Sequence, residues 1–191
     1  MIVIFGGAFN PPTKAHLAIY QLVRKTVDCE KFIFLPVSSL YTKRSLASNQ
    51  YRFEMLKLLI DDDDLASVSP LELEDADYLG TYKSLLRFQE RYPDKEITFL
   101  IGADNLLKLH KWINAHSLLA EFRFIVVNRD NTDIEAVING DPFLREFRNR
   151  FILIPDFHVD VSSTGFRESF DKTQITGKVY EYIEMHNLYR G

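Results

Sequence analysis

The sequence predicts an α/β fold built on a doubly wound, mostly parallel sheet with helices on both faces. Short runs of β-branched and aromatic residues alternate along the chain with longer stretches of helical spacing. Most of the short runs are apolar throughout, as is typical of strands that are covered on both sides. This βαβα order predicts parallel strands joined by right-handed crossovers, and ligands in such sheets bind beyond the carboxyl ends of the strands.

The strands and helices of this Rossmann-like arrangement follow one another in a regular order. Strands are expected at residues 2–5, 32–37, 66–69, 97–101, 124–127 and 151–155. Helices are expected at residues 13–27, 49–60, 81–92, 105–119 and 141–149, with two more at 165–170 and 177–186. The stretch 105–119 is expected to break near Asn114. No Gly/Ser-rich linker divides the chain, so we expect a single domain that spans residues 1–191.

Composition limits the classes of protein and of partner. The chain has 191 residues, 46% of them hydrophobic, so it can bury a sizeable core. Its formal net charge of -4 and the lack of a basic stripe argue against a nucleic-acid partner. The apolar N-terminal run is too short for a membrane span or a signal peptide, so no membrane partner is expected. The single cysteine, Cys29, forms no intramolecular disulfide, which suits the cytoplasm, and a homo-oligomer is left open.

The segment that follows the first predicted strand has the features of a phosphate-binding turn. It reads GGAFNPPTKAH over residues 6–16. Gly6 and Gly7 let the backbone approach a ligand closely, and Thr13 suits a helix N-cap. His16 then falls in the first helical turn, where unbonded N–H groups and the helix dipole favour an anion. The alternative is a plain strand-to-helix connection, because glycine and proline mark turns in any chain.

This turn differs from two common nucleotide-binding loops. It matches neither the GxGxxG pattern of dinucleotide-binding units nor the GxxxxGK[ST] pattern of P-loops. The predicted strand at 32–37 also ends without the acidic residue that would bind a ribose in a dehydrogenase. The sequence therefore disfavours a dehydrogenase and a P-loop enzyme.

A second anion site is predicted in the segment VSSTGFR, at residues 161–167. Ser162, Ser163 and Thr164 offer hydroxyls before a helical stretch, as an N-cap and as further donors. Arg167 adds a guanidinium that can bind two phosphate oxygens at once. The alternative is an ordinary capped helix with a surface arginine.

A third candidate segment, IGADN at residues 101–105, ends the predicted strand at 97–101. Asp104 would either accept hydrogen bonds from a ribose at the ligand edge of the sheet or cap the next helix. Trp112, the sole tryptophan, would either stack on a flat ligand or fill the core.

Two acidic stretches, 61–64 and 72–77, are interpreted as solvated chain rather than metal sites, because adjacent carboxylates repel one another.

Taken together, these segments resemble the bacterial nicotinate-nucleotide adenylyltransferase family. The resemblance rests on GGAFNPPTKAH, on IGADN with Trp112, on TYKSLLRFQERYP at residues 81–93 and on VSSTGFR. These occur in order along nearly the whole chain. In the wider nucleotidyltransferase superfamily, the first turn corresponds to the GxFxPxHxGH pattern and the last segment resembles ISSTxIR.

The resemblance implies adenylyl transfer from ATP to nicotinate mononucleotide, which gives deamido-NAD and pyrophosphate, with Mg²⁺ accompanying ATP. It implies catalytic roles for His16, Arg167 and Lys14. The residues that it assigns to ATP are Gly6, Gly7, Ala8, Phe9, Thr13, Gly102, Asp104, Ser162, Ser163 and Thr164. Those that it assigns to the mononucleotide are Lys43, Arg44, Thr81 and Trp112, and it implies no dedicated metal ligand.

Several positions depart from these patterns. Thr13 stands where the superfamily usually has its first histidine, Ala15 where it has glycine, and Asn10 where aspartate is frequent. Phe166 replaces a branched aliphatic residue of the closing segment. Threonine still donates a hydrogen bond but carries no charge. These changes bear on the rate and on the choice between nicotinate and nicotinamide mononucleotide, and they remove none of the essential chemistry.

Other interpretations of the same segments stay open. Another nucleotidyltransferase of the superfamily, acting on nicotinamide mononucleotide or phosphopantetheine, would share the first turn. A class I aminoacyl-tRNA synthetase has a related turn, but this chain has no room for an anticodon-binding domain and no KMSKS-like loop. A non-catalytic nucleotide-binding sensor would not need both His16 and Arg167.

Overall fold

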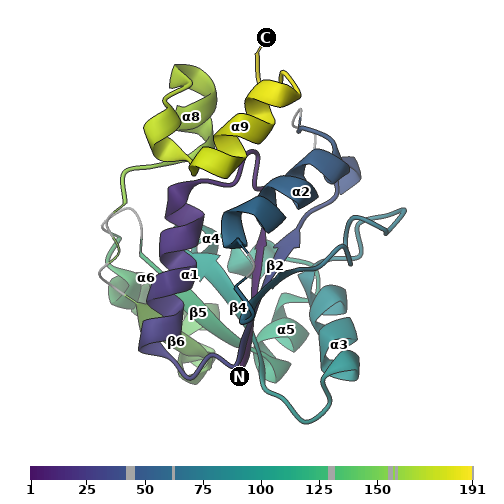
Figure 1. Cartoon of the computed structure of the whole chain (residues 1–191). Helices are drawn as coiled ribbons and strands as arrows, with labels where there is room; N and C mark the ends of the chain where they lie inside the picture. The colour runs from purple at the N-terminus through teal and green to yellow at the C-terminus, as the bar shows by residue number, and fades with distance from the viewer. Residues whose placement is uncertain (42–45, 62, 129–131, 155–156, 158, 191) are drawn as a thin grey trace. The chain divides into compact units, whose positions relative to one another are not determined.

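The computed structural model describes residues 1–41, 46–61, 63–128, 132–154, 157 and 159–190 (Figure 1). Among these residues, six strands form one sheet in the order β3-β2-β1-β4-β5-β6. Every strand pair whose register is described is parallel. This is the strand order of a Rossmann-like sheet. The predicted doubly wound α/β fold is therefore confirmed.

The chain divides into two compact units. Unit 1 contains Met1–Phe5 and Leu79–His158, and unit 2 contains Gly6–Tyr78 and Val159–Gly191. The first strand, β1 (Ile2–Gly7), contributes residues to both units. Each unit thus combines two separate stretches of the chain. The single domain expected from the sequence stays a prediction.

Unit 1 is built around three strands that pair in parallel next to the start of β1. These strands are β4 (Ile97–Gly102), β5 (Arg123–Val127) and β6 (Phe151–Ile154). Every residue of β4 is buried, as expected of an apolar run that is covered on both faces. The helices of unit 1 are α3 (Thr81–Arg91), α4 (Ala103–Leu106), α5 (Ala115–Glu121), α6 (Ile134–Gly140) and α7 (Pro142–Glu146), with 3₁₀ turns at Leu109–Lys111 and Arg148–Arg150. Helices α3 and α5 lie side by side (Figure 1).

Unit 2 pairs β2 (Lys31–Pro36) with β3 (Ala66–Val68) and packs helices onto them. Its helices are α1 (Lys14–Thr26), α2 (Asn49–Ile60), α8 (Ser163–Ser169) and α9 (Gly177–Met185), with 3₁₀ turns at Ser39–Tyr41 and Lys172–Gln174. The core contains edge-to-face aromatic packing, in which the Tyr20 ring of α1 lies 4.9 Å from that of Phe32 in β2. Helices α8 and α9 lie together in Figure 1.

Most of the predicted elements are confirmed, and α2 has the predicted bounds. The predicted helix at 105–119 breaks as expected, because Asn114 adopts a left-handed conformation with φ of 57° before α5 begins. Helix α6 is a correction, since no helix was expected between the strand at 124–127 and the helix at 141–149. It begins where the Asp133 carboxylate accepts a hydrogen bond from the Ala136 N–H at 2.9 Å, which is the N-cap pattern. No described helix is long and apolar enough to cross a membrane.

Candidate functional site

The turn that follows β1 folds back on itself around the Phe9 ring. A Cβ added to Gly7 would lie 3.1 Å from this ring, so glycine is needed for the close approach. Phe9 is buried, has φ of 47°, and places its ring 5.7 Å from Phe34 and 5.1 Å from His16. The Asn10–Pro11 peptide bond that follows is cis. The predicted turn therefore has a compact backbone that leads directly into α1.

The start of α1 fixes the tautomer of His16. Thr13 is the N-cap, as predicted, and its backbone N–H donates to Nδ1 of His16 at 2.9 Å. The Thr13 hydroxyl lies at 2.9 Å from the same nitrogen. A ring nitrogen that accepts an N–H carries no proton, so the neutral imidazole has its proton on Nε2. His16 is thereby prepared to donate through Nε2, and Lys14 is exposed in the same helical turn.

Arg52 of α2 supports the turn and was missed by the sequence analysis. Its side chain is fully buried, and burial lowers the pKa of its guanidinium. The three guanidinium nitrogens donate to the Ala8 carbonyl at 2.8 Å, the Ala47 carbonyl at 3.0 Å and Asn49 Oδ1 at 2.7 Å. The sequence could have indicated this role, because Arg52 lies three positions before Met55 and therefore on the same apolar face of α2. An arginine on such a face needs buried hydrogen-bond partners.

The Asn10 side chain is a second support that sequence reasoning did not assign. It is 4% exposed, and its Oδ1 accepts hydrogen bonds from the Ala47 N–H at 3.0 Å and the Tyr189 hydroxyl at 2.9 Å. Burial raises the pKa of Tyr189, so the hydroxyl keeps its proton and remains a donor. Tyr189 carried no local signal, because it lies 179 positions from Asn10.

Helix α8 brings the VSSTGFR segment onto the same turn. Ser162 is the N-cap, and its hydroxyl accepts from the Gly165 N–H at 2.9 Å. The Ser163 hydroxyl donates to the Pro11 carbonyl at 2.7 Å. Arg167 donates to the Asn10 carbonyl at 2.6 Å and to the Thr164 hydroxyl at 3.2 Å. The two predicted anion-binding segments, far apart in sequence, therefore meet within unit 2.

In unit 1, Gly102 and Asp104 lie where β4 gives way to α4. Gly102 is the N-cap, so the interpretation of Asp104 as a helix cap is wrong. Asp104 is exposed in the first turn of α4, and its Oδ2 accepts from the Asn105 amide at 3.3 Å. An exposed carboxylate at the carboxyl end of a buried strand can accept hydrogen bonds from sugar hydroxyls.

The two described residues that were assigned to the mononucleotide, Thr81 and Trp112, also belong to unit 1. Trp112 is half-buried, with its ring 6.2 Å from that of Phe99 in an edge-to-face arrangement. Thr81 is the first residue of α3 and follows Gly80, which has φ of 83°. A Cβ on Gly80 would lie only 3.1 Å from the Cβ of Ile113, so the glycine allows the start of α3 to pack beside the residue after Trp112.

The remaining predictions concern basic and acidic residues of unit 2. Lys43 and Arg44 lie outside the described residues.

In the acidic stretch 61–64, the Asp63 carboxylate accepts hydrogen bonds from the Tyr20 hydroxyl at 2.7 Å and from Arg24 at 2.8 Å. Burial and this hydrogen bond raise the pKa of Tyr20 to about 12. Among the described residues, no group of three or more His, Cys, Asp or Glu is placed to hold a metal ion.

Comparison with known proteins first defines the class. A sequence model described as cytidylyltransferase-like matches residues 4–169, so the protein is a nucleotidyltransferase of that family. A probable nicotinate-nucleotide adenylyltransferase of Hydrogenobaculum sp. is 35% identical, over 98% of this chain and 97% of that protein. One from Clostridium tetani is 28% identical over 98% of each chain.

These relatives, which match over nearly the whole chain, identify a particular family among the nucleotidyltransferases. The chain belongs to the nicotinate-nucleotide adenylyltransferase family, as its motifs suggested. The fold agrees with the solved structure of Plasmodium falciparum nicotinic acid mononucleotide adenylyltransferase complexed with NaAD. That likeness has a TM-score of 0.79 at 21% identity and covers 98% of this chain and 96% of the other.

Proposed function

We propose that this protein transfers the adenylyl group of ATP to nicotinate mononucleotide, with deamido-NAD and pyrophosphate as products. The observation that carries the proposal is the direct contact of the two predicted anion-binding segments through Ser163 and Arg167. These contacts bring α8, which carries Arg167, onto the turn that leads into His16 at the start of α1. Membership of a family whose relatives match over nearly the whole chain supports the same reaction.

The nucleophile of this reaction needs no general base. A phosphate monoester has a second pKa near 6, so the mononucleotide phosphate is mostly dianionic at neutral pH. One of its oxygens forms a bond to the α-phosphorus of ATP. The bond from that phosphorus to the bridging oxygen breaks, and its electron pair leaves with pyrophosphate. The protein's contribution is to align these groups and to stabilise the charge that develops on them.

His16, Lys14 and Arg167 are proposed to supply this stabilisation. The tautomer set by Thr13 leaves His16 with an Nε2–H, which can donate to the transferring phosphate. Lys14 adds a positive charge in the first turn of α1, whose dipole favours an anion. Arg167 would bind the departing phosphates, because a guanidinium matches phosphate oxygens in geometry and charge.

We propose that the other site residues bind the two nucleotides. Gly6, Gly7, Ala8, Phe9 and Thr13 would line the triphosphate, with Ser162, Ser163 and Thr164 at its distal end. In unit 1, Gly102 and Asp104 would contact the ribose and adenine of ATP, whereas Thr81 and Trp112 would contact the pyridine ring. Lys43 and Arg44 would neutralise the mononucleotide phosphate. The single cysteine suits a reducing compartment, so we expect the protein to act in the cytoplasm.

Mg²⁺ is proposed to arrive with the triphosphate rather than in a dedicated protein site. The described residues of the turn and α8 offer cations, hydroxyls and N–H groups, a set that binds phosphate oxygens. This set fits a metal that is held mainly by phosphates and water, as Mg²⁺ commonly is. When bound, the ion would offset negative charge on the phosphate oxygens.

The test is pyrophosphate release from ATP with three acceptors compared side by side: nicotinate mononucleotide, nicotinamide mononucleotide and phosphopantetheine. We expect the fastest release with nicotinate mononucleotide. A preference for either other acceptor would keep the enzyme class and change the substrate. Nucleotide binding measured by calorimetry, with no turnover on any acceptor, would instead support a non-catalytic sensor and contradict the proposal.

A further inference from the structure

Tyr189 contacts both anion-binding segments of unit 2. Its hydroxyl donates to Oδ1 of Asn10 in the turn, at 2.9 Å. Its ring stands perpendicular to that of Phe166 in α8, with the ring centroids 6.5 Å apart. Phe166 is fully buried and Asn10 nearly so, which places both contacts away from bulk water. One side chain therefore joins the turn to the helix that carries Arg167.

Asn10 and Phe166, the two partners just described, are also positions where the sequence departs from the superfamily patterns. Asn10 stands where aspartate is frequent, and Phe166 stands where a branched aliphatic residue is usual. An amide oxygen is a neutral acceptor that suits the neutral hydroxyl, and an aromatic ring at 166 gives the tyrosine ring an edge-to-face partner. Both departures thus suit contact with the same tyrosine.

The backbone after α9 directs Tyr189 toward the turn. The Asn187 N–H donates to the Glu184 carbonyl at 3.2 Å, and the Leu188 N–H donates to the Ile183 carbonyl at 3.0 Å. Asn187 and Tyr189 both have positive φ, at 50° and 62°. A tyrosine seldom adopts this conformation unless its surroundings fix it. The hydroxyl and ring contacts are those fixing interactions.

We propose that Tyr189 is a positioning residue for the transfer reaction, which holds the turn of residues 6–16 against α8 through Asn10 and Phe166. The inference rests on the proposed function. Arg167 donates to the Asn10 backbone carbonyl, and Tyr189 donates to the Asn10 side chain, so both act on one residue. If the hydroxyl is removed, the side-chain oxygen of Asn10 loses one of its two described donors and the turn gains freedom next to His16. Misplacement by a fraction of an ångström is enough to slow a reaction that depends on alignment.

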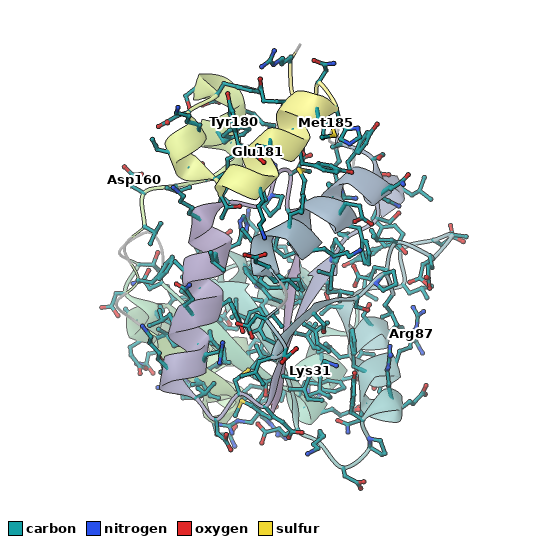
Figure 2. All side chains as sticks on the ribbon, in the orientation of Figure 1. Lys31, Arg87, Asp160, Tyr180, Glu181 and Met185 are labelled. Atoms are coloured by element: carbon teal, nitrogen blue, oxygen red, sulfur yellow. The ribbon has the colours of Figure 1, made fainter. Side chains whose placement is uncertain are left out.

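The test compares Tyr189→Phe with Tyr180→Phe. The first variant removes only the hydroxyl and keeps the ring on Phe166. The second removes a hydroxyl from α9, where Tyr180, labelled in Figure 2, packs its ring near Phe170 with the centroids 6.4 Å apart. For Tyr189→Phe we expect turnover to fall by roughly three- to tenfold, the effect of losing one neutral hydrogen bond. The KM for the mononucleotide should change less than about twofold, and Tyr180→Phe should match the parent.

Amide hydrogen exchange provides a readout that does not depend on catalysis. In Tyr189→Phe, the N–H groups of residues 6–16 should exchange several times faster, with unit 1 unchanged. Equal acceleration across both units would show a general loss of stability and overturn the proposal, as would unchanged exchange and unchanged turnover. If the parent protein shows no transfer activity, the proposed function fails, and the exchange result still decides whether Tyr189 holds the turn.

Discussion

The turn of residues 6–16 and the segment of residues 103–113 differ in how firmly they are held. The turn is fixed by partners from distant parts of unit 2, above all the buried Arg52 and the half-buried Tyr189. The segment in unit 1 contains a four-residue helix and a 3₁₀ turn; it buries Leu106 and Leu109 but exposes Leu107 by 54% and Ile113 by 50%. Groups that stabilise a transferring phosphate must be preorganised, whereas a surface that recognises a ring can adjust. The contrast therefore matches the chemistry proposed for each region.

The strongest test of this contrast is His16→Ala. Loss of one preorganised donor should lower turnover by roughly 10²–10³-fold, while the KM values change much less. Steady-state kinetics with both substrates measures this effect. The control is His116→Ala, which removes a side chain that is 71% exposed in unit 1 and should leave turnover unchanged. Near-normal turnover in His16→Ala would remove the histidine from the proposed mechanism.

Arg52→Lys tests whether the turn depends on its buried support. A lysine cannot reach three separate acceptors with planar geometry, so buried oxygens would lose their donors. We expect the free energy of unfolding to fall by about 2–3 kcal/mol, as measured by urea denaturation. The matched control on α2 is Lys57→Ala, an exposed position whose loss should cost less than about 1 kcal/mol. Equal effects for the two variants would contradict the supporting role.

Trp112→Ala tests the more adjustable region. If the indole packs on the pyridine ring, the KM for the mononucleotide should rise by about tenfold, a typical loss for an aromatic contact. The KM for ATP should stay close to that of the parent, and Trp112→Phe should show a smaller change. A shift in the KM for ATP instead would reverse the proposed assignment of the two nucleotides.

The smallest effect is expected where the Asp63 carboxylate accepts hydrogen bonds from Tyr20 and Arg24 of α1. The Tyr20 hydrogen bond holds the pKa of Asp63 below its ordinary value of 3.8. Its stabilisation is therefore present above that value and is lost as the pH falls through the lower folded-state pKa. Asp63→Asn should cost about 1 kcal/mol of unfolding free energy at pH 7.

The pH dependence distinguishes this cluster from a general surface effect. The difference between Asp63→Asn and the parent should shrink as the pH falls below about 4, because the Asp63 carboxylate takes up a proton first in the unfolded state and then, at its lower pKa, in the folded state. The control is Asp64→Asn at the neighbouring exposed position, which should match the parent throughout. A cost that is independent of pH would contradict the role of the charged carboxylate.

The sequence revealed features that are encoded locally. The alternation of apolar runs predicted the strands, and short motifs predicted the first turn and an N-cap among the hydroxyls of residues 162–164, which the structure places at Ser162. The break near Asn114 was also predicted, and asparagine tolerates the left-handed conformation that the structure shows there. Helix α6 was missed, since its seven residues end in glycine and give too little periodicity.

The unpredicted part of the candidate site consists of long-range contacts. Arg52 binds the Ala8 carbonyl from 44 positions away, and Tyr189 binds Asn10 from 179 positions away. Only the fold determines which carbonyls a buried arginine meets, so a local motif cannot show such partners. The roles assigned to His16, Arg167 and the other site residues stay predictions until they are tested by kinetics.

Unit 2 combines two stretches that are far apart in the sequence, and this affects when the turn of residues 6–16 acquires its contacts during folding. Residues 6–78 contain His16 and Arg52, but α8 and Tyr189 belong to the second stretch of the unit. Bringing these two stretches together closes a loop over residues 79–158, which costs conformational entropy. The contacts of α8 and Tyr189 with the turn should therefore be among the last to form during folding. A fragment that ends before α8 would contain His16 but would lack the contacts that Ser163, Arg167 and Tyr189 make with the turn. Supplying residues 159–191 as a separate peptide would be the direct way to complete it.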